Sequence, residues 1–236
     1  ALDLDSGVFA LQFDEPVTRA SLDMTKCTLA AADNEDSERV LFTNTHEFLE
    51  STDIDARRVR NLLRLDFDPV TDGMGSEVLY VKLSQKDLNN LKIAETLAVD
   101  IQSTKWLSEL GWVADSVTAN PSPSVTYETA RNFSTDVTSP LLTGGTVDLD
   151  AAILTLQADE PVRGASANAS YFRISSRADG SGHTVDVDAD TLLSPDAKDA
   201  TSLNFRLDCF TLDQLKLWGP HQAFLSHQPF RYEHGG

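Results

Sequence analysis

A segment at the start of this 236-residue chain returns 145 residues later without a gap. Residues 2–21 read LDLDSGVFALQFDEPVTRAS, and residues 147–166 read VDLDAAILTLQADEPVRGAS. Eleven of these twenty positions are identical, far more than unrelated segments share. A duplicated unit of this length indicates a tandem array of like domains. Such arrays span distances, present other domains or adhere to partners, so the repeat already indicates a class of function.

Two further pairs of segments follow in the same order. VKLSQKDLNNLK at 81–92 is similar to FRLDCFTLDQLK at 205–216, with an offset of 124. A shorter and weaker pair is WLS at 106–108 and FLS at 224–226, with an offset of 118. Because the order is kept while the offset falls, the second copy is predicted to be the same domain with shorter loops.

The end of the first copy is marked by a change in composition. The run NPSPS at 120–124 is stiff and turn-rich, and serine and threonine dominate the residues after it. We therefore predict a first repeat over 1–125, a Ser/Thr-rich connector and start of the next repeat over 126–146, and a second repeat over 147–236. The second repeat is expected to be incomplete at its C-terminal end, because the chain stops at HGG where the first copy continues with WVADSVTANPS.

Short alternating segments predict an all-β fold. Leucine alternates with aspartate over 2–5, and an apolar strand follows a turn over 8–13, which is a hairpin pattern. Pro16 and Pro161 are expected to end this strand in each copy, because proline lacks the N–H that a sheet ladder needs. Further strands are predicted over 27–31, 39–43, 62–67, 77–83, 105–108 and 112–118 in the first copy, and over 171–176, 183–188, 201–207 and 223–227 in the second.

Each copy is also predicted to contain one short helix. The SQKD sequence at 84–87 reads as a capping box, and Asp208 takes the cap position in the second copy. Leu88 and Leu91 are three residues apart and are placed to pack on the sheet. The polar segment 44–61 is expected to be an extended loop or an excursion at a sheet edge. The sequence therefore predicts two tandem β-sandwich domains, each with one short helix.

The chain carries a formal net charge of −18. Such a charge repels nucleic acid and anionic lipid and is compatible with calcium or basic partner surfaces. No run approaches the ~18 apolar residues that a membrane span needs, and no basic-then-apolar leader opens the sequence. We therefore expect neither nucleic-acid binding nor membrane insertion of this segment.

The two cysteines are too few for a disulfide scaffold. Cys27 aligns with Phe172 and shares an alternating face with Leu29, so it is predicted to lie in the core. Cys209 aligns with Gln85 just after the helix cap and is predicted to be exposed. The two thiols are therefore not expected to be bonded to each other.

The string LDLDSGVFALQFDEPVTRASLD, followed by VLYVKLSQKDLNNLK and ADSVTANPS, resembles the tandem Ig-like or cadherin-like repeats of large algal and protist surface proteins. In that family a unit reads like FDLDLNxGxLTLTFSEPVNxSSLD, then VTVTLSxxDLNxLK, then a closing VxDxxGNP. The second copy departs from this pattern, with LDCFTLDQLK at the helix and no closing motif. The resemblance implies extracellular Ig-like β-sandwiches in series on a cell or flagellar surface, with a structural or adhesive role, as in the hair-like filaments called mastigonemes. Its implied partners are copies of itself, other surface glycoproteins and glycans.

Recurring carboxylates are the candidate metal ligands. Ca²⁺ takes six to eight oxygen ligands, and acidic residues repeat near the start of each copy. The candidates are Asp3, Asp5, Asp14, Glu15, Asp148, Asp150, Asp159 and Glu160. The alternative is that Asp3 and Asp5 form the solvated face of an amphipathic strand, which their alternation with leucine also predicts. Calcium is therefore the one cofactor that the sequence leaves open.

Motifs for catalysis are absent from the sequence. It contains no phosphate-binding glycine loop, no G-x-S-x-G and no H-E-x-x-H, so a non-enzymatic role is predicted. The histidines near the C terminus are spaced too widely for a typical zinc pattern and are interpreted as surface residues: His221, His227 and His234. The three tryptophans are interpreted as core residues or as stacking platforms for a sugar: Trp106, Trp112 and Trp218.

Two N-glycosylation sequons occur, at Asn132 and Asn168, both in predicted loops. By the resemblance, Pro121 and Pro123 are candidate hydroxyproline sites in an algal host. The sequence thus predicts a non-enzymatic extracellular structural segment of a large surface or filament glycoprotein. The alternatives are a calcium- or carbohydrate-binding adhesion module, or accessory domains of a larger hydrolase.

Overall fold

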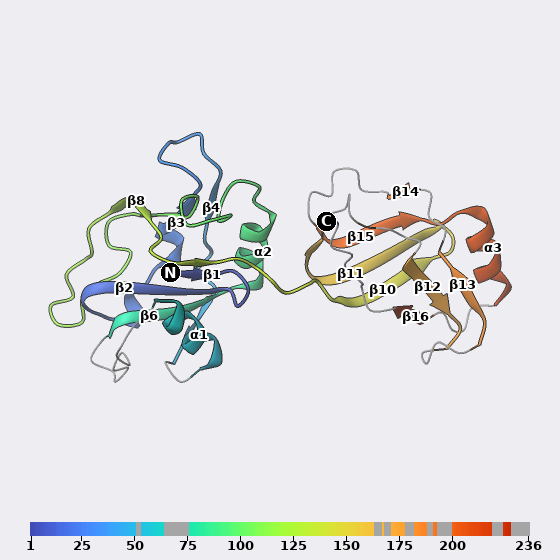
Figure 1. Cartoon of the computed structure of the whole chain (residues 1–236), viewed down its shortest axis with the longest axis horizontal. Helices are drawn as coiled ribbons and strands as arrows, with labels where there is room; N and C mark the ends of the chain where they lie inside the picture. Colours follow the sequence, from blue (N-terminus) through green and yellow to red (C-terminus); the bar gives the residue numbers. More distant parts are fainter. Residues whose placement is uncertain are drawn as a thin grey trace. The chain divides into compact units, whose positions relative to one another are not determined.

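The computed structural model describes residues 1–50, 53–63, 76–162, 167, 171–177, 182–187, 191–192, 200–218 and 224–227. The chain divides into two compact units, Ala1–Thr138 and Ser139–Gly236. Both consist mostly of β-strands in several sheets with a few short helices (Figure 1). This confirms the all-β class that the alternating segments predict.

The first unit contains two β-sheets that share one core. Its strands are β1 (Leu2–Asp3), β2 (Val8–Val17), β3 (Cys27–Ala30), β4 (Arg39–Leu41), β5 (His46–Leu49), β6 (Ser76–Leu83), β7 (Lys105–Ser108), β8 (Val125–Thr129) and β9 (Phe133–Ser134). One sheet has the order β5-β6-β2-β1-β9 and the other β4-β3-β7-β8. Phe9 of β2 packs edge-on against Trp106 of β7, with ring centroids 5.5 Å apart. Leu79 and Leu29 are buried in the same cluster, so side chains of both sheets fill the space between them.

The first unit also contains two α-helices and two short turns of 3-10 helix. They are α1 (Ile54–Leu63), α2 (Gln85–Ile93) and the short 3-10 turns Arg19–Ser21 and Met24–Lys26. Helix α2 begins as predicted, because the Ser84 side chain accepts a hydrogen bond from the N–H of Asp87. Leu88 and Leu91 are buried, as their spacing predicts.

Helix α1 corrects the prediction of an extended loop over 44–61 and of one helix in each unit, whereas β5 at the edge of its sheet agrees with the predicted edge excursion. It packs on the face of β2 and β6 that points away from the main core, where Val59 joins Val8, Val78 and Tyr80 (Figure 1). Val59 is the one buried side chain among those described in α1. Val59, Leu62 and Leu63 stand at the i, i+3, i+4 spacing of a helical face, but the prediction assigned Leu62 and Leu63 to a strand over 62–67 and so missed this period.

The second unit follows the same plan. Strands β10 (Leu142–Asp148), β11 (Ile153–Val162), β15 (Ala200–Arg206) and β14 (Thr191–Leu192) form one sheet in that order, and β13 (Thr184–Asp186), β12 (Phe172–Ser175) and β16 (Phe224–His227) form another. Helix α3 (Cys209–Leu217) is capped by Asp208, which accepts a hydrogen bond from the N–H of Thr211. Leu154, Ile174 and Leu215 are buried in one cluster, so both sheets and the helix contribute to this core.

The sequence repeat is reproduced in the hydrogen-bonded ladders. Ala10 lies opposite Tyr80 in the β2–β6 ladder. Thr155 stands 145 positions after Ala10, and Asn204 stands 124 positions after Tyr80. These two residues lie opposite each other in the β11–β15 ladder. Both ladders lose their regular register after the fifth residue of the longer strand. Helices α2 and α3 begin 124 residues apart, which is the offset of the matching sequence segments. The two units are therefore copies in strand pairing as well as in sequence.

The structure differs from the predicted strand limits in three places. Pro16 lies inside β2 and Pro161 inside β11 rather than at their ends, and each missing proline N–H falls within the break in its ladder. The strand predicted over 112–118 is reduced to isolated bridges. The strand predicted over 62–67 begins within α1, and residues 64–67 lie outside the described residues.

Residues 126–146, predicted as a connector, are largely taken up by strands. β8 pairs with β7, and β9 pairs in parallel with β1, so both belong to the first unit. β10 pairs with β11 in the second unit. Threonine and valine in this segment favour strands, and Phe133 packs on the first core. The boundary between the units therefore falls after Thr138.

Cys27 is buried and Cys209 is exposed, as predicted, and both are free thiols. Burial raises the pKa of Cys27 to about 12, and the carboxylates of Asp23 and Glu109 act in the same direction. Because the thiolate is the reactive form, we expect a thiol reagent at pH 8 to modify Cys209 promptly and Cys27 only as fast as the first unit unfolds. Counting labelled thiols with and without denaturant measures this, with Cys209→Ser as the control. Prompt labelling of both cysteines in the native chain would contradict it.

Candidate functional site

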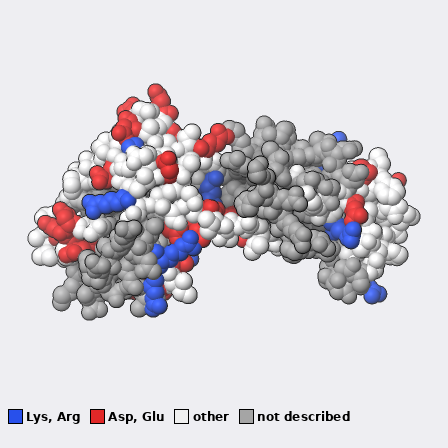
Figure 2. Space-filling view, in the orientation of Figure 1, with Lys and Arg blue, Asp and Glu red and all other residues white. Residues whose placement is uncertain are grey.

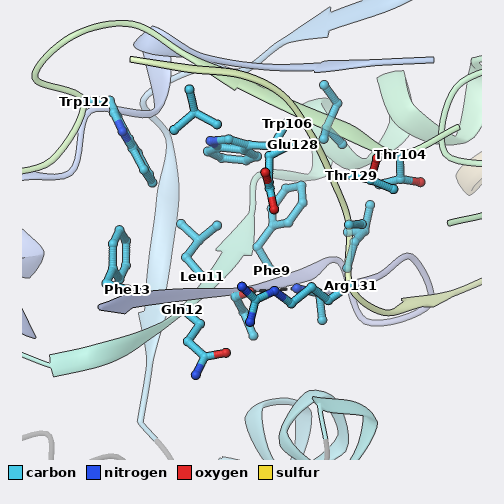
Figure 3. Close-up of a pocket in the computed structure, with 16 residues that line it drawn as sticks. Phe9, Leu11, Gln12, Phe13, Thr104, Trp106, Trp112, Glu128, Thr129 and Arg131 are labelled. Atoms are coloured by element: carbon cyan, nitrogen blue, oxygen red, sulfur yellow. Dashed lines mark hydrogen bonds between the residues drawn. The ribbon is translucent and has the colours of Figure 1, made fainter. Parts of the chain in front are cut away.

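The first unit has a pocket of about 200 Å³ between its two sheets. Four aromatic rings line it: Phe9, Phe13, Trp106 and Trp112 (Figure 3). Ring centroids lie 5.5 Å apart between Phe13 and Trp112 and again between Trp112 and Trp106. The pocket therefore offers an apolar wall on which flat or aliphatic groups can pack.

Polar side chains stand at the mouth of this pocket. Glu128 lies opposite Trp106 in the β7–β8 ladder and points into the pocket, while Arg131 reaches along its other side (Figure 3). Strand β8 carries one extra residue relative to β7 here, and Tyr127 has a φ of 54°. The Tyr127 hydroxyl accepts a hydrogen bond from Arg39 Nη2 at 2.6 Å, which holds the distorted segment. A β-bulge of this kind re-aims its neighbours, and Glu128 directly follows it.

The indole nitrogens of Trp106 and Trp112 are buried and have no hydrogen-bond partner within the part of the chain that the structure describes. A buried donor without an acceptor costs on the order of 1–3 kcal/mol. Native folds seldom leave such groups unsatisfied. Two tryptophans of the pocket wall therefore carry buried donors that the described residues leave unsatisfied.

The aromatic wall is a feature of the first unit. The positions 145 residues after Phe9 and Phe13 are Leu154 and Ala158. Leu154 is buried in the second core, so an aliphatic side chain takes the place of the ring. The two copies share their strand pairing but not the chemistry at this point of the core.

The pairing of Trp106 with Phe224 in the sequence comparison is wrong by one residue. Leu29 lies opposite Trp106 in the β3–β7 ladder. Its copy in the second unit, Ile174, lies opposite Leu225 in the β12–β16 ladder. The three-residue match at this point is too short to fix a register, whereas the ladder fixes it directly.

The acidic candidates Asp3 and Asp5 are held by other residues of the first unit. Arg58 of α1 approaches Asp3 through Nε at 2.8 Å and Asp5 through Nη1 at 2.5 Å. Asp3 also accepts a hydrogen bond from the Ser6 hydroxyl at 2.8 Å, and Asp5 accepts one from the Thr138 hydroxyl at 2.6 Å. Asp3 is buried, so its interpretation as part of a solvated strand face is wrong. The helix that supplies Arg58 is the element that the sequence pattern did not predict.

Replacing Arg58 by methionine is expected to destabilise the first unit by about 2 kcal/mol, because the buried Asp3 carboxylate loses its charged partner while Arg58 itself is partly exposed. Burial raises the pKa of Asp5, but hydrogen bonds from Thr138 and Arg58 outweigh it and hold this pKa well below its ordinary range. The stabilisation that the ionised Asp5 carboxylate gives through Arg58 should therefore be present above about pH 4 and be lost as the pH falls further. Urea unfolding at pH 7 and at pH 2.5 measures this, with the exposed Arg57→Met as the charge-matched control. Equal midpoints for the two variants at pH 7 would overturn it.

The other acidic candidates are spread along their strands. Asp14 and Glu15 are exposed on β2, and Asp148 and Asp150 are exposed at the end of β10 and after it. Asp148 accepts a hydrogen bond from the N–H of Asp150 at 2.9 Å, which is a turn contact. On the face shown in Figure 2, carboxylates are scattered over the first unit with lysine and arginine side chains among them.

The last acidic pair, Asp159 and Glu160, lies on β11. Asp159 accepts a hydrogen bond from the N–H of Leu141 at 2.8 Å, and Glu160 is buried. Among the described residues, no group of three or more His, Cys, Asp or Glu side chains is placed to hold a metal ion. Calcium binding therefore stays a proposal.

The predicted modification sites fall in different settings. Asn132 is half-buried just before β9, and its carbonyl accepts a hydrogen bond from the N–H of Leu2 at 3.1 Å. Pro121 and Pro123 are exposed. Asn168 lies outside the described residues.

The remaining aromatic and histidine candidates belong to the second unit. Trp218 is partly buried and packs against the second core. This contact agrees with its interpretation as a core residue. His221, His234 and the side chain of His227 lie outside the described residues.

Comparisons with protein-family models, curated proteins and solved structures give no match. No helix among the described residues is long and apolar enough to cross a membrane. The role of the chain is therefore inferred from the two repeated units and from the pocket in the first of them.

Proposed function

We propose that this chain is a non-enzymatic, extracellular structural segment of a large surface or filament glycoprotein, built from two tandem Ig-like β-sandwich domains. The observation that carries the proposal is the repetition of the β2–β6 ladder as the β11–β15 ladder, at constant offsets and with the same interruption. The copy keeps the strand pairing, while Leu154 and Ala158 replace the pocket rings Phe9 and Phe13, so the framework is kept and the side chains of the pocket are not. Keeping a framework is what a spacing or mechanical role requires.

The use of the buried polar groups supports a structural role. The Asp87 carboxylate accepts hydrogen bonds from the Thr43 and Ser84 hydroxyls, and Asp3 is paired with Arg58. These carboxylates hold strands and helices together. A catalytic acid or base has to face a substrate. Because the carboxylates of Asp87 and Asp3 face other groups of the protein, their contacts favour a structural role over a catalytic one.

The proposed surface location rests on the resemblance of the repeat motifs and on the sequons, of which Asn132 is partly exposed. A chain of net charge −18 repels its own copies at close range. Cations, basic partners or glycans are therefore expected between neighbouring copies, and mastigoneme-type filaments are one assembly that fits.

Immunogold labelling of intact source cells tests the location. An antibody raised against the chain should label the outer surface or its filaments without permeabilisation, at spacings that repeat along a filament. Label confined to the cell interior would overturn the proposal.

A carbohydrate-binding adhesion role is the second candidate, and the pocket is the observation that favours it. Trp106 and Trp112 provide ring surfaces, and Glu128 and Arg131 provide polar contacts at the mouth. Titration with a panel of oligosaccharides, followed by tryptophan fluorescence, should then shift the emission of the parent chain but not of Trp106→Leu. Calcium binding would instead raise the melting temperature as Ca²⁺ is added.

A further inference from the structure

Strands β1 and β9 of the first unit are far apart in the sequence and lie side by side in one sheet. They pair in parallel, with Leu2 opposite Phe133. The N–H of Leu2 donates to the carbonyl of Asn132 at 3.1 Å, and the N–H of Leu4 donates to the carbonyl of Ser134 at 3.0 Å. In Figure 1 the yellow-green segment that leaves the first unit runs beside β1.

A parallel pair of this kind resists tension along the chain. Tension that enters through β1 and leaves through β9 pulls the two strands in opposite directions along their length. The hydrogen bonds of a parallel ladder are evenly spaced along the strands, so this pull loads them together. Strands that are pulled apart from one end lose their bonds one at a time. The β1–β9 pair is therefore sheared rather than unzipped.

The Asp5 carboxylate extends this connection beyond the end of β9. Its Oδ1 accepts hydrogen bonds from the Val137 N–H at 3.3 Å, the Thr138 N–H at 3.0 Å and the Thr138 hydroxyl at 2.6 Å. Its Oδ2 contacts Nη1 of Arg58. Hydrogen bonds to a charged group are stronger than those between neutral groups. The carboxylate therefore holds Thr138, the last residue of the first unit.

Helix α2 holds the same segment from another element. Lys92 Nζ lies 2.7 Å from Asp136 Oδ2, and the Lys92 side chain is only 10% exposed. Asp136 Oδ1 in turn accepts a hydrogen bond from the N–H of Thr138 at 3.2 Å. Residues 132–138 are thus fastened to β1, to Asp5 and to α2.

We propose that β1, β9 and the Asp5 carboxylate form a mechanical clamp, which keeps the first unit folded when the chain is stretched. The clamp holds residues 132–138, through which the chain leaves the unit, against β1. The proposal rests on the structural role proposed above, because only a chain that carries tension in an assembly uses such a clamp. It depends on the pairing of β1 with β9 and is the same whether or not residues precede Ala1.

The test stretches the full chain between its two ends at constant force and times the unfolding of the first unit, which is the longer step. Asp5→Ala should shorten the lifetime of the folded first unit about tenfold, because forced unfolding follows the unfolding rate and the clamp loses its charged acceptor. Thr138→Val removes one of the three donated hydrogen bonds and should shorten it about threefold. The matched control is Asp150→Ala, which changes the exposed copy of Asp5 in the second unit and should leave this lifetime unchanged.

A second pulling direction separates a clamp from a general gain in stability. Glu35 and Val117 are exposed and lie outside β1 and residues 132–138. With cysteines at these two positions and Cys209→Ser, force is applied across the first unit without shearing β1 against β9. In this direction Asp5→Ala should change the lifetime by less than about twofold.

Two outcomes would overturn the proposal. One is an Asp5→Ala chain whose first unit lasts as long as the parent when it is stretched from its ends. The other is an equal shortening in both pulling directions, which would make Asp5 an ordinary stabilising residue. The proposed surface location fails separately, since antibody label confined to the cell interior would leave these lifetimes as they are.

Discussion

Replacing Asp87 by alanine is expected to destabilise the first unit by about 3 kcal/mol, because it removes a charged acceptor that several buried donors share. Asp87 is fully buried at the first turn of α2. Its carboxylate accepts hydrogen bonds from the Thr43 hydroxyl at 2.6 Å, the Thr43 N–H at 3.2 Å and the Ser84 hydroxyl at 2.9 Å. Alanine would remove all three acceptor contacts and leave a buried backbone donor unsatisfied.

The second unit supplies a matched control for this change. Thr211 occupies the copy of the Asp87 position and is equally buried, but it carries no charge. Thr211→Val removes the hydroxyl at nearly constant shape, so it should change the stability of the second unit by no more than about 1 kcal/mol. Urea unfolding of both variants compares them. An Asp87→Ala chain as stable as the parent would show that α2 is not tied to the fold through this carboxylate.

Truncating equivalent core leucines in the two units is expected to lower two separate unfolding transitions. Leu79 and Leu203 lie opposite the copied residues Leu11 and Leu156, and both are buried. Each leucine-to-alanine change should cost about 2–5 kcal/mol, because it removes buried apolar contacts and leaves a cavity. Each core is made from residues of its own unit, so each cost should fall on that unit.

Differential scanning calorimetry separates the two effects. Leu79→Ala should lower the transition of the first unit alone and Leu203→Ala that of the second alone, and the double variant should show both shifts added. If either change lowered both transitions together, the units would fold as one cooperative body and the tandem-domain interpretation would fail.

Much of the fold could be predicted because the duplication constrains it. The offsets of 145 and 124 read from the sequence are the offsets of the paired strands and of the helices α2 and α3. Helix capping was also readable, since Ser84 and Asp208 both accept the expected backbone hydrogen bond. In each case two segments of the chain carry the same signal, so a local pattern is supported by its copy.

The features that could not be predicted lack such support. In helix α1, Val59, Leu62 and Leu63 have the spacing of a helical face, but the many charged residues around them favoured a loop instead. The salt bridges from Arg58 to Asp3 and Asp5 depend on tertiary packing and leave no pattern in the sequence. The pocket joins β2 to β8 across more than a hundred residues, and tertiary packing decides that contact. The calcium candidates illustrate the same limit, because alternation with leucine does not reveal that Arg58 reaches Asp3.

The central claim is that the chain consists of two independent structural modules in series, and stretching single molecules tests it most directly. Held at both ends, each molecule should lengthen in two discrete steps. At about 3.6 Å per residue, the unfolding of residues 1–138 and 139–236 can release at most roughly 500 Å and 350 Å. Leu79→Ala should weaken only the longer step and Leu203→Ala only the shorter one. A single step that releases the whole length, or a smooth extension without steps, would contradict the claim.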